Sequence, residues 1–229
     1  RYTATNSFNE EEGHDVVVGP NRAIYVTGMN DQQATSQIRG VTFCLCPAVD
    51  GVCLLAPQAR SAFPATAMAG IDLDQDGWRD LVFDIPLQNS LGVYMNGPDG
   101  FTLSFPVVLP GAPTLLATGD LDQDGDEDLV TGTFGGADLH VVVNGNGTRA
   151  YSGTIPLGDG VLDLVMADLD GQNGPDVVAV KNQAPYLYVL LNNGDGSLTT
   201  TTPTGVPNPY RVAVGDVSGD GVPDLLIGR

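Results

Sequence analysis

The stretch Asp72-Leu-Asp-Gln-Asp-Gly-Trp-Arg-Asp80 decides the fold, because a related acidic loop recurs three more times at a constant spacing of 48 residues. A fixed period of this length is typical of repeat architectures, in which each repeat is one supersecondary unit. Oxygen-bearing side chains at loop positions 1, 3, 5 and 9 favour a hard cation, above all calcium. The later copies span 120–128, 168–176 and 216–224.

Each acidic loop lies between two short runs of β-prone residues. In the second copy these runs are Leu115-Leu-Ala-Thr-Gly119 and Asp128-Leu-Val-Thr131. A third run ends in Asn96, Asn144 or Asn192, again at the same spacing, and a turn then leads to a more polar fourth run. Four short antiparallel strands in each ~45 residues, without a helical period, predict one blade of a β-propeller.

The predicted fold is therefore all-β: a β-propeller of five blades, each of four antiparallel strands, with the calcium loops between first and second strands. We expect one domain over residues 1–229, and an N-terminal blade without a metal loop, because Pro20-Asn-Arg-Ala23 contains no carboxylate. Since the chain begins and ends within a blade, we expect it to be part of a longer protein. The predicted blades are 14–60, 61–108, 109–156, 157–204, and 205–229 closed by 1–8.

The loop pattern predicts which residues would bind the metal. Aspartates at positions 1, 3 and 5 aim three carboxylates at one point, and glycine at position 6 permits a sharp turn. The carbonyl of residue 7 and the carboxylate at position 9 extend the oxygen shell toward the six to eight ligands of calcium. The candidate ligands are Asp72, Asp74, Asp76, Trp78 and Asp80; Asp120, Asp122, Asp124, Asp126 and Asp128; Asp168, Asp170, Gln172, Gly174 and Asp176; and Asp216, Ser218, Asp220, Val222 and Asp224.

The four loops differ in the calcium affinity that their ligands predict. The first two carry all four carboxylates, the third has Gln172 at position 5, and the fourth loses one carboxylate to Ser218. We therefore expect up to four calcium ions, bound most tightly in the first two loops. The alternative is that Asp- and Gly-rich segments simply form turns; four copies with the same ligand positions argue against it. The expected role of the metal is structural, because it joins the first strand of a blade to the second.

Composition excludes several classes of partner. The chain has 28 acidic and 9 basic residues and a net charge of -19, which argues against nucleic acid and anionic membranes. No apolar run reaches the ~20 residues of a spanning helix, so direct membrane insertion is not expected.

Two covalent features are possible from the sequence. Cys46 and Cys53 flank a short turn and can form a hairpin disulfide; the alternative is that all three cysteines are reduced. Asn146-Gly-Thr148 is an N-glycosylation sequon in an expected hairpin turn, so Asn146 is a candidate acceptor.

The loop grammar resembles the FG-GAP/VCBS repeats, the calcium-loop blades of integrin α-type propellers. The best matches are residues 187–196 and 211–227, and the resemblance covers residues 61–229. It implies an extracellular, secreted or cell-surface setting, with an adhesive or scaffolding role. Integrin propellers have seven blades, more than this chain can form.

The leading functional hypothesis is a non-catalytic extracellular calcium-binding propeller, an adhesion, recognition or structural module with a protein or glycan partner outside the cell. A lectin that binds glycans between blades is the second hypothesis. Tyr25, Trp78, Tyr94, Tyr151, Tyr186 and Tyr210 would supply its stacking faces. A propeller glycosidase is the third; it needs two carboxylates in the central funnel, but almost all acids belong to the loops. The expectation is that the chain is not an enzyme.

Overall fold

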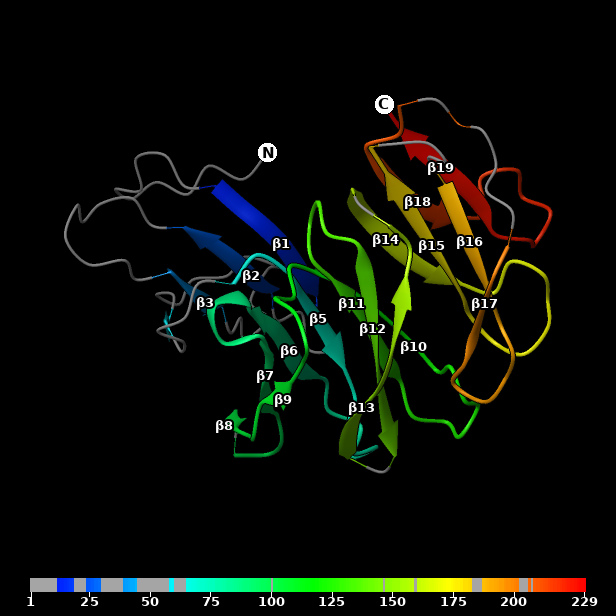
Figure 1. The fold of residues 1–229 in the computed structure, drawn as a ribbon. Coiled ribbons are helices and arrows are strands. Elements are labelled where there is room, and N and C mark those ends of the chain that lie inside the picture. The colour runs from blue at the N-terminus through cyan, green and yellow to red at the C-terminus, as the bar shows by residue number, and fades with distance from the viewer. Residues whose placement is uncertain are drawn as a thin grey trace.

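The computed structural model is all-β and consists of a series of antiparallel sheets (Figure 1). It describes side chains for residues 65–99, 101–145, 147–158, 160–182, 187–201, 206 and 208–229, and the backbone alone for 12–18, 24–29, 39–44 and 58–59. Within these residues the helical content is a single 3-10 turn at Pro86–Gln88. None of the described helices is long and apolar enough to cross a membrane.

Three of the sheets contain four strands that pair in chain order. The first sheet contains β1 (Glu12–Val18), β2 (Ile24–Met29), β3 (Arg39–Cys44) and β4 (Gln58–Ala59). The third contains β10 (Leu115–Gly119), β11 (Asp128–Gly132), β12 (Asp138–Gly145) and β13 (Thr148–Pro156). The fourth contains β14 (Val161–Ala167), β15 (Asp176–Lys181), β16 (Leu187–Asn192) and β17 (Leu198–Thr200).

The other two sheets depart from four strands. The second contains β5 (Met68–Ile71), β6 (Asp80–Ile85), β7 (Ser90–Met95) and β8 (Thr102–Leu103), and β9 (Val107–Val108) also pairs with β7. The last consists of β18 (Arg211–Gly215) and β19 (Asp224–Gly228). The sheets follow one another in chain order, and β1, β5, β10, β14 and β18 contact each other in sequence (Figure 1). The predicted all-β fold is thus confirmed, and most of its antiparallel sheets have four strands.

Ring closure and the blade count stay predictions. In the described residues, no strand pairing joins β18–β19 to the first sheet. The predicted contribution of residues 1–8 to the last blade lies outside the described residues, as does the carboxylate-free loop at residues 20–23.

The core consists of apolar layers between neighbouring sheets. Ile71, Leu73 and Val93 of the second unit pack with Leu129 and Val142 of the third. The same arrangement recurs between the third and fourth sheets, and between the fourth sheet and β18–β19. The second strands β6, β11 and β15 are covered on both faces and are therefore buried along their whole length. These rigid layers hold the ends of the loops in fixed positions.

The acidic loops have a constant place in this framework. Each leaves the last residue of a first strand and returns to the residue directly opposite, so that position 9 is the first residue of the second strand. The opposed pairs are Ile71 and Asp80, Gly119 and Asp128, Ala167 and Asp176, and Gly215 and Asp224.

Candidate metal centre

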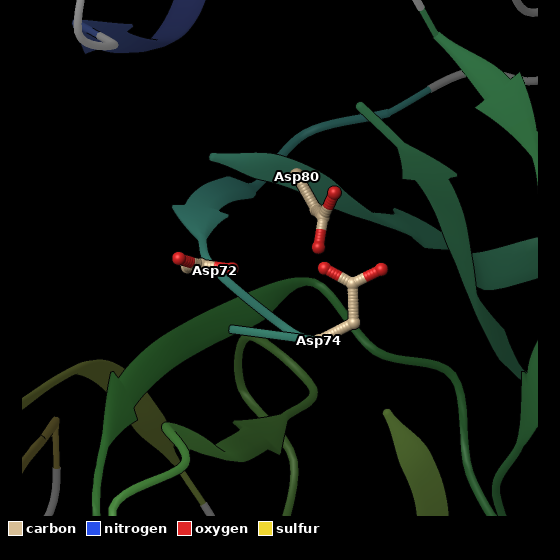
Figure 2. Close-up of side chains that lie close together, drawn as sticks. All are labelled: Asp72, Asp74 and Asp80. Carbon is tan, nitrogen blue, oxygen red and sulfur yellow. The ribbon is translucent and has the colours of Figure 1, made fainter. Parts of the chain in front are cut away.

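Three of the four loops bring carboxylates together. In each, the aspartates at positions 1, 3 and 9 offer one oxygen apiece, and these oxygens lie within 4.8 Å of one another. Figure 2 shows the first cluster, where Asp74 from the loop and Asp80 from the start of β6 face each other beside Asp72. The other two clusters are Asp120, Asp122 and Asp128, and Asp168, Asp170 and Asp176.

The aspartate at position 9 is the buried anchor of each loop. In the second loop Asp128 is 0% exposed. Its Oδ2 accepts a hydrogen bond from the backbone N–H of Leu121 at 2.7 Å, and its Oδ1 accepts one from the N–H of Asn144 at 2.8 Å. One carboxylate therefore joins the start of the loop to the end of the third strand. The same pair of bonds occurs at Asp80 and at Asp176.

The aspartate at position 1 holds the turn of the loop. Oδ2 of Asp72 accepts from the N–H of Gly77 at 2.9 Å, and Oδ2 of Asp120 accepts from Gly125 at 3.1 Å. These two glycines have φ of 86° and 94°, which is the left-handed region that glycine adopts without strain. Position 6 thus requires a left-handed backbone, which glycine supplies in these two loops and Asn173, with φ of 58°, supplies in the third.

Position 5 behaves differently from the other carboxylates. Asp76 and Asp124 lie outside the clusters, and each accepts a hydrogen bond from the N–H of residue 7, at 2.8 and 2.9 Å. Gln172 in the third loop donates its N–H to Asp170. It stays a prediction that position 5 and the carbonyl of position 7 contribute oxygens to the metal shell. The position 7 residues are Trp78, Asp126, Gly174 and Val222.

The fourth loop keeps the backbone pattern without a triple carboxylate cluster. Asp216 accepts from the N–H groups of Gly219 and Gly221, and Asp224 accepts from those of Val217 and Ser218. With Ser218 at position 3, only two of the three converging positions carry a carboxylate. These backbone bonds lower the pKa of Asp224, as expected for a carboxylate that accepts N–H groups at the surface.

Burial makes the first two clusters electrostatically costly when no cation is present. It raises the pKa of Asp80 to about 6, and the negative charges of Asp74 and Asp76 add to the effect. It likewise raises the pKa of Asp128 to about 6, with Asp122 adding to the rise. The pKa of Asp122 is itself raised, chiefly by burial. A cation would reverse this balance, because it stabilises the charged form of every carboxylate it contacts.

An unpaired oxygen shows that the cluster suits a cation. Oδ1 of Asp120 is buried and has no hydrogen-bond partner in the described residues, although it belongs to the second cluster. Buried polar atoms are normally paired, so each exception needs an explanation. Three convergent carboxylates with an unused oxygen match the all-oxygen shell of a hard cation. The donor set therefore fits calcium.

The sequence patterns missed one component of the site. Asn96, Asn144 and Asn192 were expected only to open hairpin turns, yet the backbone N–H of each binds the position 9 aspartate. The signal was present in the sequence, since each asparagine follows its aspartate by a constant 16 residues.

Comparison with known families accounts for these loops. The model of the FG-GAP-like repeat matches residues 72–131 and 157–227, which is more than half of the chain. The chain belongs to the FG-GAP-like repeat family. The resemblance predicted from the loop grammar is thereby confirmed. No curated protein matches the chain.

Solved structures support the propeller-type fold. A protein from Lactobacillus plantarum is 15% identical with a TM-score of 0.60; the match covers 89% of this chain and 59% of that protein. This FG-GAP-like repeat chain thus spans less than two thirds of that relative. A protein provisionally named a gluconolactonase is 16% identical with a TM-score of 0.50, and the match covers 90% and 68% of the two chains.

The second neighbour corrects one prediction. The sequence analysis expected that the chain is not an enzyme, because its carboxylates are concentrated in the loops. That prediction is wrong, because this fold does not exclude catalysis. A structure with the same fold is provisionally named a gluconolactonase. At this level of identity the likeness establishes the fold alone, so catalysis has to be measured directly.

Several predicted features lie outside the described residues. They are the disulfide between Cys46 and Cys53, the glycosylation site at Asn146, and, for the lectin hypothesis, Tyr186 and the side chain of Tyr25, whose backbone alone is described in β2. Of the other aromatic candidates, Tyr94 is buried and stacks on Phe83 with ring centroids 5.5 Å apart, so it offers no face to a sugar. Tyr151 and Tyr210 are exposed, on β13 and beside β18.

Proposed function

We propose that this protein is an extracellular calcium-binding propeller that serves as an adhesion, recognition or structural module, in which calcium completes and stabilises the blades. The observation that carries the proposal is the convergence of three aspartates in each of three loops, around a buried aspartate that joins three segments of the blade. Calcium is favoured because every donor is an oxygen and the loops are open enough for a large shell.

The expected energetic role follows from extracellular conditions. Extracellular modules bind calcium with Kd of about 10⁻⁴–10⁻³ M. Millimolar calcium then stabilises the folded state by roughly 0.4–1.4 kcal/mol per site, because only the folded state binds. Over several sites this is a sizeable part of a net stability of about 5–15 kcal/mol. The family membership supports the extracellular setting. Sites of this affinity also suit that setting, because a dilute cytosolic calcium pool would leave them empty.

Calorimetric titration of chelator-treated protein tests the proposal. We expect saturable calcium binding at several sites and a higher Tm in calcium than in chelator, with magnesium at the same concentration giving a smaller shift. Magnesium is the sharper control because it demands near-octahedral geometry and keeps its water ligands. Absence of binding heat together with an unchanged Tm would refute the proposal.

The gluconolactonase neighbour makes an enzymatic role the second candidate. It is tested by measuring hydrolysis of gluconolactone by the wild-type protein in calcium and in chelator. Turnover above the uncatalysed rate that is lost in chelator would place the metal loops in a catalytic role and would replace the adhesion proposal. Turnover at the uncatalysed rate in both conditions would exclude this substrate.

A further inference from the structure

The first two metal loops are connected by hydrogen bonds that cross from one sheet to the next. Nδ2 of Asn144, at the end of β12, donates to the carbonyl of Leu73 in the first loop at 3.0 Å. Leu73 and Asn144 are 71 residues apart in the chain. A side chain of the third sheet therefore holds the backbone of a loop in the second.

This bond is the middle of a longer chain. The N–H of Leu73 donates to Asp80 at 2.8 Å, and the N–H of Asn144 donates to Asp128 at 2.8 Å. The two buried anchors of neighbouring metal clusters are thus joined through the backbone of Leu73 and through Asn144, which uses its own N–H on one side and its side-chain amide on the other. Each of these bonds holds a residue that takes part in the next one, so that ordering one loop restrains the position of the other.

A second contact connects the same two loops. Nε2 of Gln75, at position 4 of the first loop, donates to Oδ1 of Asp126, at position 7 of the second. The N–H of Asp126 in turn donates to Asp124 at 2.9 Å. Because Gln75 lies between two candidate ligands, Asp74 and Asp76, ordering of the first loop also restrains Asp126 at position 7 of the second.

We propose that Gln75 and Asn144 are positioning residues that couple the first two cation sites, so that a cation in one loop tightens binding in the other. The inference rests on the proposed metal binding and adds a prediction about its cooperativity. Each loop has an ordered form that the cation selects, and the inter-sheet bonds make the ordered form of one favour that of its neighbour. By linkage, the coupling is equal in both directions.

The second and third loops are the internal control. Position 4 of the second loop is Gln123, with φ of 61° against 57° for Gln75, but position 7 of the third loop is Gly174, which offers no side-chain acceptor. Nδ2 of Asn192, the counterpart of Asn144, has no hydrogen-bond partner in the described residues. The remaining link is the N–H of Gly196 to the carbonyl of Leu121 at 3.3 Å. Coupling is therefore expected to be strong only between the first two loops.

Simple electrostatics predicts the opposite sign. A cation in the second loop neutralises nearby aspartates and repels a cation in the first, which would weaken binding there. Positive coupling that depends on Gln75 and Asn144 thus separates the hydrogen-bonded mechanism from charge interactions alone.

Terbium(III) luminescence sensitised by Trp78 provides the readout for the first loop. Trp78 is the only tryptophan in the chain and occupies position 7 of that loop, so indole excitation reports a bound lanthanide there. The probe is terbium(III), with calcium competition to confirm that both ions share the site. The second loop is disabled by Asp122→Ser, which copies the Ser218 found at position 3 of the fourth loop. Asp120→Asn is the second variant, to be used if Asp122→Ser fails to fold by circular dichroism.

We expect disabling the second loop to raise the terbium midpoint of the first loop at least about fivefold, the lower end of typical coupling between sites. The coupling ratio is the terbium midpoint with the second loop disabled divided by the midpoint with it intact. Gln75→Ala should reduce this ratio, and Gln75→Ala combined with Asn144→Ala should bring it to one. The matched variants Gln123→Ala and Asn192→Ala should leave it unchanged. A ratio of one or below in the wild-type background, or equal effects of the matched variants, overturns the inference. Absence of any tryptophan-sensitised signal in the wild type would instead overturn metal binding by the first loop.

Discussion

Asp128→Asn is the substitution that best separates the structural and the metal-binding roles of the loops. Asp128 is fully buried, accepts two backbone N–H groups and belongs to the second cluster. Asparagine has the same shape and keeps one acceptor oxygen, but it removes the charge that a cation requires. Its effect on Tm should therefore depend on whether calcium is present.

In chelator, two effects of the substitution oppose each other. Burial raises the pKa of Asp128 from 3.8 to about 6, so carrying the charge at neutral pH costs about 3 kcal/mol, which asparagine removes. Against this, one backbone N–H now faces the amide group instead of an oxygen, which costs about 1–3 kcal/mol. The sum is close to zero or slightly favourable, and Tm in chelator should stay within a few degrees of the wild type or rise.

In calcium, the variant loses the stabilisation from one site. At a calcium concentration a hundredfold above Kd this is about 2.7 kcal/mol. Set against the gain of 0 to about 2 kcal/mol that the substitution brings without calcium, the net loss is about 0.7–2.7 kcal/mol. At about 2–4 °C per kcal/mol for a domain of this size, Tm in calcium should be lower than that of the calcium-loaded wild type by about 1–11 °C. Differential scanning calorimetry in calcium and in chelator measures both values on the same samples.

Asp84→Asn is the matched control. Asp84 is equally buried, its pKa is also raised by burial, and it accepts hydrogen bonds from Thr66 and Ala67, but it lies outside the metal loops. Its effect should be the same in calcium and in chelator. If Asp128→Asn lowers Tm equally in both conditions, the aspartate acts only as a link between strands, and the cation argument for the second loop fails.

Three further predictions follow from the geometry. Calcium affinity of the first two loops should fall as the pH drops through about 6, because Asp80 and Asp128 take up protons there; titrations at several pH values measure this, and equal affinity at pH 5 and pH 7.5 would contradict it. In chelator the same two groups should make the protein more stable as the pH falls from about 6 to about 4, since their folded pKa lies above the unfolded value of 3.8 and the folded state binds more protons; a melt series in chelator whose Tm falls over this range would argue against the raised values. Gly92→Ala should cost about 1–3 kcal/mol in calcium and in chelator alike, because a Cβ there would lie 2.3 Å from the ring of Phe83; denaturant unfolding measures it, and Gly153→Ala, which meets no atom within 4 Å, is the control.

The sequence predicted the parts of the fold that repeat. The 48-residue spacing set the number of loops, and the run beginning at each position 9 aspartate marked the second strand. The turn in each of the first two loops was equally predictable from the sequence, because Gly77 and Gly125 occupy positions that need a left-handed backbone. The pattern placed positions 1, 3 and 5 at one point, with position 9 completing the shell, whereas in the structure the carboxylates of positions 1, 3 and 9 lie together. The carboxylate of position 5 instead accepts a hydrogen bond from the N–H of residue 7, which ligand spacing alone does not predict.

Contacts between sheets were beyond a pattern that describes one blade at a time. Gln75 and Asp126 are 51 residues apart, which is one period plus three, so their meeting depends on how two blades pack. The burial of individual side chains also depends on contacts between blades, so the repeat pattern alone does not predict it. Val82, Val130 and Val178 occupy one register position and are fully buried, but Leu226 at the equivalent place in β19 is 45% exposed.

That contrast at Leu226 shows why the surroundings of a residue, and not its type, decide its role in a repeat. In β6, β11 and β15 the second strand has a neighbour on each side, whereas in the described residues β19 pairs with β18 alone. The fourth loop joins these two strands, and in the described residues its Asp224 accepts no bond from an asparagine like those that bind position 9 in the other loops. Its Asp224 instead accepts both the Val217 and Ser218 N–H groups on one oxygen. In the first three loops the second oxygen of the position 9 aspartate is thus held by the third strand of the same blade, so the orientation of this carboxylate depends on the blade as well as on the nine residues of the loop.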